Sequence, residues 1–200
     1  KYLAPNWFAM VMSVAGLAIA WARATPLLGE LATAGALVLA AAAALLFVAL
    51  LVLSWIRWQH HPEALAADLK HPVRHAFIAT LPVSLILLAS AAAMLFGPET
   101  WVAVLWWTGS LTQFGVTLWV LARWLSADRS QGLSWAALTP VLFIPVVGNV
   151  LAPLAGVMLG APAWTAAQFG LGVLLWPVLL ALIGARIATQ GLWPDRKSVV

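Results

Sequence analysis

The side chains best suited to catalysis or metal binding gather in one polar stretch between two long apolar segments. Its histidines and carboxylates are His60, His61, His71, His75, Glu63 and Asp68. Histidines four residues apart on one helix face can share a metal ion, and histidine-dependent membrane metalloenzymes use such pairs. Pro72 lies between His71 and His75, so we expect His71 to precede a helix. We therefore predict interfacial, solvated or capping roles for these histidines, with a metal site as the alternative.

Other catalytic chemistry has little support in the sequence. The chain contains no cysteine, which excludes thiolate metal sites, disulfides and cysteine nucleophiles. No G-x-S-x-G elbow or phosphate-binding loop occurs. Four serines without a histidine partner in their segments are better explained as helix-packing hydroxyls: Ser54, Ser84, Ser90 and Ser110. The sequence thus predicts no enzyme, no cofactor and no metal.

The composition identifies the elements that must position these residues. The chain is 64% hydrophobic and 8% charged, whereas about a quarter of a soluble domain is charged. The stretches without Asp, Glu, Lys or Arg are 2–22, 31–56, 76–98, 100–122 and 130–185. A membrane-spanning helix needs about 20 apolar residues, so the first four stretches predict one span each and the last predicts two. The expected fold class is an all-α membrane protein.

We expect six transmembrane helices arranged as three hairpins within a single domain covering residues 1–200. Their predicted ranges are 6–22, 31–57, 76–96, 100–124, 135–158 and 163–187. Glycine and proline end helices readily, and they punctuate the turns at Pro26 with Gly29, at Gly97 with Pro98, and at Gly160 with Pro162. The long polar stretch contains a short helix, predicted over 62–69, that we expect at the membrane surface.

The basic residues predict the orientation of the chain. With the N-terminus and the C-terminus in the cytoplasm, the cytoplasmic segments contain Lys1, Arg57, Lys70, Arg74, Arg123, Arg129, Arg186, Arg196 and Lys197. The opposite side contains Arg23 alone, an asymmetry that satisfies the positive-inside rule. The basic residues flank spans and form no stripe, so they indicate topology and not nucleic-acid binding.

Prolines and one amide are the unusual residues within the spans. Pro82 lies in the third predicted span, Pro140, Pro145 and Pro153 in the fifth, and Pro177 in the sixth. An interior proline removes a backbone hydrogen bond and bends a helix, and irregular backbone at membrane depth is tolerated beside protein or a water-filled cavity. The fifth span is therefore the best candidate for a pore wall, with interhelical packing as the alternative.

Asn149 and Gly156 of the fifth span, and Gly160 just after it, have alternative explanations too. The Asn149 amide either bonds a neighbouring helix, which is the commoner role, or faces a pore. Gly156 and Gly160 have the small-xxx-small spacing of a close helix contact. The spans contain no fixed charge at their centres, which disfavours proton pumps and carriers that use a buried carboxylate.

Two stretches resemble a known family. The sequence from Asp68 to Ser84, with His71, Pro72 and Arg74 at the cytoplasmic start of the third span and Pro82 within it, resembles the corresponding segment of the tellurite-resistance/dicarboxylate transporter family. The sequence from Pro140 to Gly156, with Pro145 and Asn149, is similar to the fifth span of the same family. This family includes the bacterial tellurite-resistance channel and the slow-type anion channels of plant guard cells.

The resemblance implies a larger assembly than six spans. Family members have ten spans in five hairpins, form homotrimers in the bacterial inner membrane, and line a pore with their odd-numbered helices. By that pattern Pro82, Pro140, Pro145 and Asn149 would be pore-lining, and the partners would be small anions and the lipid bilayer. A ninth-span phenylalanine plugs the family pore, and neither Phe8 nor Phe143 is assigned that role here. We expect this chain to be the first six spans of a longer protein.

The function that the resemblance implies is an anion channel or passive transporter for chloride, nitrate or C4-dicarboxylates, with tellurite resistance as a further expectation. The alternatives are a membrane scaffold subunit without transport and the histidine-dependent metalloenzyme described above.

Overall fold

The computed structural model of the protein describes residues 5–126 and 138–190, and within these ranges every regular element is helical. In chain order the α-helices and the 3₁₀ helices (η) are η1 (Pro5–Trp7), α1 (Phe8–Arg23), α2 (Thr25–Leu28), α3 (Glu30–His60), α4 (Pro62–Lys70), η2 (Arg74–Ala79), α5 (Thr80–Phe96), α6 (Thr100–Trp124), η4 (Pro140–Leu142), α7 (Phe143–Val150), α8 (Pro153–Gly156) and α9 (Pro162–Gln190). The expected all-α membrane fold class is confirmed.

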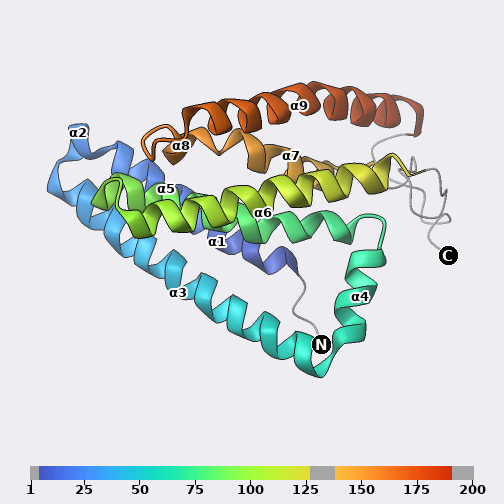
Figure 1. Cartoon of the computed structure of the whole chain (residues 1–200), viewed down its shortest axis with the longest axis horizontal. Coiled ribbons are helices and arrows are strands. Elements are labelled where there is room, and N and C mark those ends of the chain that lie inside the picture. The colour runs from blue at the N-terminus through green and yellow to red at the C-terminus, as the bar shows by residue number, and fades with distance from the viewer. Residues whose placement is uncertain (1–4, 127–137, 191–200) are drawn as a thin grey trace.

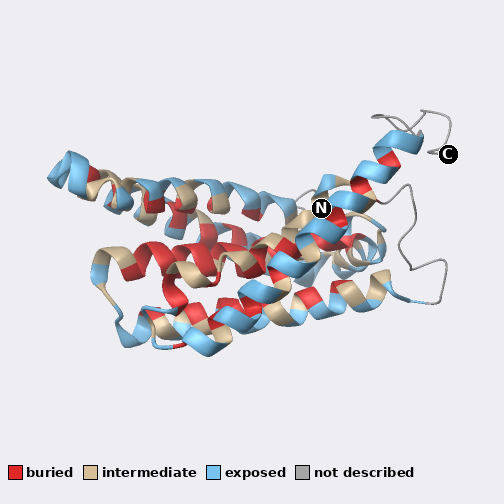
Figure 2. Cartoon of the chain, turned by 90° about the horizontal axis from the view of Figure 1, so that it is seen from above, coloured by how far each residue is buried: buried red, intermediate tan, exposed pale blue. Residues whose placement is uncertain are grey.

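Helix α5 forms the centre of the bundle. It contacts α1 and α6 extensively, α1 also packs along α3, and α7 packs along α9 (Figure 1). Buried residues run along the middle of the bundle, while the outer helices expose long faces (Figure 2). In the apolar 18-residue stretch of the span Arg74–Phe96, 72% of the residues are buried, whereas in that of Glu30–His60 the share is 22%. The third predicted span is therefore the core of this part of the protein.

Small side chains allow the outer helices to approach the core. The alanine-rich stretch of α3 buries Ala32, Ala36 and Ala43 completely. Ala43 joins Phe47, Val11 and other residues in a cluster that fills the space between α1, α3 and α5. Moving a side chain such as Phe47 from water into an apolar core contributes about 1.5–3 kcal/mol. Because lipid is itself apolar, this gain is smaller in a membrane, and packing contacts carry much of the stability of this cluster.

Glycines end the helices where the sequence predicts turns. Gly29 has a φ angle of 59°, Gly97 of 84° and Gly160 of 78°, all in the left-handed region that favours glycine. Gly97 separates the long helices α5 and α6, while Gly29 and Gly160 lie shortly before the long helices α3 and α9. Pro162 then begins α9, where its missing N–H is one of the unpaired donors of the first turn.

Four described helical segments have the length and hydropathy of membrane spans: Pro5–Arg23, Glu30–His60, Arg74–Phe96 and Pro162–Thr189. They coincide with the first, second, third and sixth predicted spans. Helix α6 has 25 residues, about 37 Å, but threonines and Gln113 lower its hydropathy. The protein is a multi-pass membrane protein, and the count of six spans stays a prediction.

The fifth predicted span differs from a continuous bent helix. Residues 135–137 lie outside the described ranges, and the apolar segment Pro140–Gly156 is divided into η4, α7 and α8. Pro140 begins η4, Pro145 lies in the first turn of α7, and Pro153 begins α8. Proline is tolerated in a first turn because no helical bond is lost there, so these prolines divide the span into short segments.

Candidate functional site

The predicted pore-lining prolines occupy two neighbouring segments of the core. Pro82 is buried in the first turn of α5, and Pro145 is buried in α7, which contacts α5. Pro140, at the start of η4, is exposed. The structure thus brings Pro82 and Pro145 onto packed helices, and their pore-lining role stays a prediction.

Hydroxyl groups fix the start of α5 against α1. The Thr80 hydroxyl donates to the Pro5 carbonyl at 2.8 Å, and the Ser84 hydroxyl lies 3.1 Å from the Phe8 carbonyl. Each hydroxyl also lies within hydrogen-bonding distance of a carbonyl of its own segment, as hydroxyls in apolar helices commonly do. Ser84 is therefore a helix-packing hydroxyl, as the sequence predicts.

The Asn149 amide is completely buried and belongs to a polar network between helices. Its Nδ2 donates to the Pro145 carbonyl at 2.9 Å and to the Thr117 hydroxyl at 2.8 Å. Its Oδ1 accepts a bond of 3.2 Å from Nε2 of Gln168. These contacts join α7 to both α6 and α9. They realise the interhelical alternative for this amide, and whether Asn149 also contacts a pore stays a prediction.

The Pro145 carbonyl is the acceptor on which this network converges. Nε2 of Gln113 donates to it at 2.7 Å, and the Thr117 hydroxyl lies 2.9 Å away. Both residues lie on α6, so the network ties the first turn of α7 to a long continuous helix. Oε1 of Gln113 is buried without a hydrogen-bond partner among the described residues.

A second part of the network connects Ser110 of α6 to Trp164 and Gln168 of α9. The Ser110 hydroxyl donates to Oε1 of Gln168 at 2.6 Å and accepts from the Trp164 indole N–H at 2.8 Å. Nε2 of Gln168 also donates to the Ser110 carbonyl at 3.2 Å. Sequence reasoning missed Gln113, Thr117 and Gln168. The signal for the two glutamines was an amide side chain within a long apolar segment, at Gln113 in α6 and at Gln168 in α9.

Two glycines leave room for side chains of α6 that pack against α7 and α8. A Cβ atom on Gly148 would lie within 2.5 Å of the Gln113 amide, and one on Gly156 would come within 2.3 Å of Trp106. Gly156 therefore marks a close helix contact, as its spacing predicts. Gly160, by contrast, has open space around it and serves the left-handed turn before α9.

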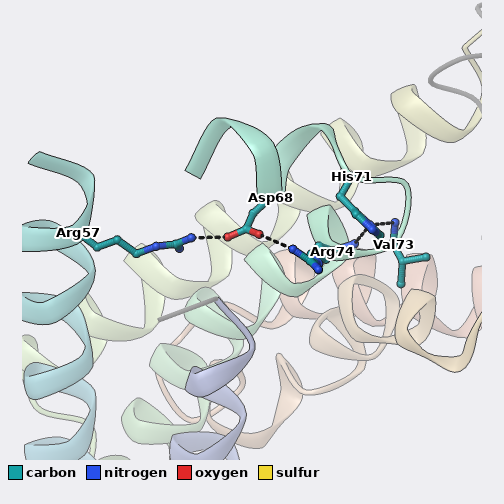
Figure 3. Close-up of polar contacts among 5 residues, drawn as sticks. All are labelled: Arg57, Asp68, His71, Val73 and Arg74. Atoms are coloured by element: carbon teal, nitrogen blue, oxygen red, sulfur yellow. Dashed lines mark hydrogen bonds and ion pairs between the residues drawn. The ribbon is translucent and has the colours of Figure 1, made fainter. Parts of the chain in front are cut away.

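An ion pair and a histidine organise the basic end of the bundle. Arg57 of α3 contacts Oδ2 of Asp68 at 2.7 Å, and Arg74 contacts Oδ1 at 3.4 Å (Figure 3). Nδ1 of His71 accepts the backbone N–H groups of Val73 at 3.1 Å and Arg74 at 3.2 Å. Asp68 is buried although the helix that carries it was predicted at the surface.

The environment of His71 favours its neutral form. Partial burial lowers the pKa of His71 below its ordinary value of 6.5, the Arg74 charge lowers it further, and the Asp68 charge acts in the opposite direction. The two backbone donors require an unprotonated Nδ1, which agrees with this direction. His71 accepts the backbone N–H groups of the two residues at the start of η2, and the exposed Pro72 follows it.

The remaining histidines do not gather around a common point. His75 is buried with its ring 5.9 Å from that of Trp119, and His61 lies 3.4 Å from the Glu63 carboxylate. Among residues 5–126 and 138–190, no group of three or more His, Cys, Asp or Glu side chains is arranged to bind a metal. The described geometry therefore offers no support for the metalloenzyme alternative.

Comparison with known proteins identifies the family. A family model described as voltage-dependent anion channel matches residues 2–200. Two curated relatives from Methanocaldococcus jannaschii, each described as an uncharacterized transporter, are 31% and 27% identical to the chain over 159 residues. Each alignment covers 78% of the chain and 44% of the relative, so the chain spans less than half the length of these relatives. The family and these relatives are channels and transporters and not enzymes. The resemblance drawn from the third and fifth spans is confirmed. The chain belongs to the voltage-dependent anion channel family.

Proposed function

We propose that this chain is the pore-forming part of a channel or passive transporter for small anions. The observation that carries the proposal is the family match over residues 2–200. Chloride, nitrate and C4-dicarboxylates are the proposed substrates, and tellurite resistance is a proposed physiological consequence. Because the chain spans 44% of the length of its relatives, the activity is proposed for the full-length protein.

The neutral core supports passive transport. Helices α5, α7 and α8 contain no Asp, Glu, Lys, Arg or His. A passage along such helices has no buried carboxylate to couple a cation and no fixed cation to bind an anion tightly. Selectivity would then depend on pore width, backbone dipoles and the cost of removing water from the ion.

We propose that α1, α5 and the divided segment α7–α8 form part of the pore wall. Pro82, Pro140 and Pro145 would shape that wall by interrupting the regular backbone, and Asn149 would fix the Pro145 carbonyl that the interruption leaves irregular. His71, Pro72 and Arg74 would form the cytoplasmic start of the third span.

The positions of the basic residues support an orientation with both termini in the cytoplasm. Helix α4 and the C-terminal ends of α6 and α9 lie at one end of the bundle, and α2 lies at the other (Figure 1). The end with α4, which we call the basic end, has the described basic residues Arg57, Lys70, Arg74, Arg123 and Arg186. Arg23 lies next to α2, at the opposite end. Lys1, Arg129, Arg196 and Lys197 lie outside the described residues. A homotrimer in the bacterial inner membrane completes the proposal.

The test is ion flux through the full-length protein in liposomes and planar bilayers. We expect anion-selective current or efflux that is independent of a proton or sodium gradient. Absence of anion flux from correctly inserted protein, under voltages of both signs, would contradict the proposal and favour a scaffold subunit. The substrate set is tested separately, by reversal potentials in chloride, nitrate and malate.

A further inference from the structure

A cavity at the basic end of the bundle has the chemistry of an anion receptor. Its volume is about 210 Å³, and it lies where the start of α1 meets the end of α3, α4 and the beginning of α5. Phe8, Leu65 and Leu81 supply apolar walls, and Ser54, Arg57 and Trp58 of α3 supply polar groups. The last three residues follow the i, i+3, i+4 spacing, so they share one helix face.

The polar groups of this cavity are hydrogen-bond donors with unused capacity. The Arg57 side chain is 10% exposed and directs Nη2 to Asp68, while its Nε is buried without a hydrogen-bond partner among the described residues. The Ser54 hydroxyl and the Trp58 indole N–H make no hydrogen bond to another described side chain or backbone group. A guanidinium has five N–H donors and no acceptor, so an oxyanion would satisfy what Asp68 leaves unpaired.

The charges around the cavity also call for an anion. The single Asp68 carboxylate is shared by two guanidinium groups, those of Arg57 and Arg74 (Figure 3). One positive charge therefore remains uncompensated within this cluster. Arg74 pairs with Asp68 at the longer distance and its side chain is 61% exposed, so the excess charge lies at the aqueous surface, where it attracts anionic lipid headgroups.

An apolar cleft continues from the cavity along α3. The cleft has a volume of about 490 Å³ and shares Ser54, Trp58 and Leu65 with the cavity. It extends over Leu51, Val52 and Trp55, whose side chains are 44%, 51% and 56% exposed. From Trp58 to Leu51 the helix rises about 10 Å towards the middle of the span. A cavity that has its polar groups on the α3 side thus continues into an apolar cleft deeper in the membrane.

We propose that the cavity and the cleft together bind one anionic phospholipid. The phosphate group would accept hydrogen bonds from Arg57, Ser54 and Trp58, and an acyl chain would lie in the cleft against Leu51 and Trp55. Tryptophan favours this interfacial depth, and basic residues near the surface attract anionic lipids. The cavity borders α1 and α5 of the proposed pore wall, but its test measures lipid retention and does not depend on anion flux.

The experiment measures lipid retention by the full-length protein. The protein is reconstituted in phosphatidylcholine nanodiscs with rising fractions of phosphatidylglycerol, and the lipids that stay bound are counted by native mass spectrometry. We expect about fivefold preferential retention of phosphatidylglycerol, the factor that one basic residue near the surface provides. The double variant Arg57→Gln/Asp68→Asn removes the guanidinium that lines the cavity and keeps the net charge of the cluster at +1, because Arg74 remains. It should abolish this preference.

Two further variants separate the site from general effects. Ser54→Ala/Trp58→Phe preserves the ion pair and should reduce the preference while leaving thermal stability in phosphatidylcholine unchanged. Lys70→Gln removes one exposed charge from α4 and should retain the preference. An equal loss in Lys70→Gln, or an unchanged preference in Arg57→Gln/Asp68→Asn, would overturn the proposal. Displacement of the lipid by millimolar inorganic phosphate would identify a free-oxyanion site and also overturn it.

Discussion

Replacement of Asn149 by alanine tests whether this amide stabilises the packing of α7 against its neighbouring helices. The substitution removes the bonds from Nδ2 to the Pro145 carbonyl and the Thr117 hydroxyl, and the bond that Oδ1 accepts from Gln168. Interhelical hydrogen bonds in membranes contribute about 0.6 kcal/mol each on average. Two of the three bonds are interhelical, those with Thr117 and Gln168, so their loss predicts a decrease of about 1 kcal/mol in the free energy of unfolding.

The predicted loss is not larger because every partner keeps another bond. The Pro145 carbonyl still accepts from Gln113 at 2.7 Å, and Nε2 of Gln168 still donates to the Ser110 carbonyl at 3.2 Å. No buried group is left unpaired by the truncation, so the larger penalty of an isolated polar group in an apolar environment does not arise.

The assay is equilibrium unfolding of the full-length protein in mixed micelles with rising sodium dodecyl sulfate. Thr108→Ala is the control, because the Thr108 hydroxyl is exposed and bonds only the Val104 carbonyl of its own helix at 2.8 Å. We expect its free energy of unfolding to stay within about 0.5 kcal/mol of the wild-type value. In a double-mutant cycle, Asn149→Ala and Thr117→Val should couple by about 0.6 kcal/mol.

A different result would refute this reasoning. If Asn149→Ala is no more destabilising than Thr108→Ala but changes the anion conductance of the full-length channel, the amide acts on the ion and not on the helices. In that case the network described here would have no energetic role, and the pore-facing alternative would be the correct one.

The other predictions concern the divided span, a close contact and the basic end. Pro145→Ala restores a backbone N–H in the first turn of α7, so η4 and α7 can join into one helix; we expect altered single-channel conductance or gating with unchanged membrane insertion. Gly148→Ala places a Cβ within 2.5 Å of the Gln113 amide and should lower the free energy of unfolding by about 1 to 3 kcal/mol, whereas Gly16→Ala, with open space around it, should not destabilise. Because the pKa of His71 is lowered in the folded state, the stability it supports is complete above pH 6.5 and decreases as the pH falls below that value, since the folded protein resists the protonation that the unfolded chain accepts. His71→Asn keeps an acceptor for the two backbone N–H groups and should remove this acid sensitivity in a denaturation series; the same pH slope in both proteins would exclude His71 as its source.

The helix ends could be predicted from the sequence because their causes are local. Gly29, Gly97 and Gly160 adopt positive φ angles, which few other residues tolerate, and Pro162 begins the helix that follows the last of them. Such signals depend only on the residue and its neighbours in sequence. They located the hairpin turns, and the charge-free lengths between them predicted the long helices.

The network around the Pro145 carbonyl could not be predicted in this way. Whether Gln113, Asn149 and Gln168 meet depends on the rotation of three helices about their axes, and the apolar composition of those helices fixes no rotation. The same holds for Asp68, which is 11 residues from Arg57 and 6 from Arg74 and is buried because these two residues converge on it. Contacts between elements require the packed structure.

In the proposed channel, the distribution of polarity would attract anions at one end of the path without binding them along its length. Cationic side chains such as Arg57, Arg74 and Arg123 gather at the basic end, where they raise the local concentration of anions. Within the bundle, Gln113, Asn149 and Gln168 bond to groups of neighbouring helices. The proposed wall helices α5, α7 and α8 contain no charge, and α1 carries only Arg23, at its last residue. A fixed cation at membrane depth would slow the exit of each anion that it bound. A neutral wall behind a basic vestibule instead allows an anion to enter readily and leave quickly, which is the condition for rapid passive transport.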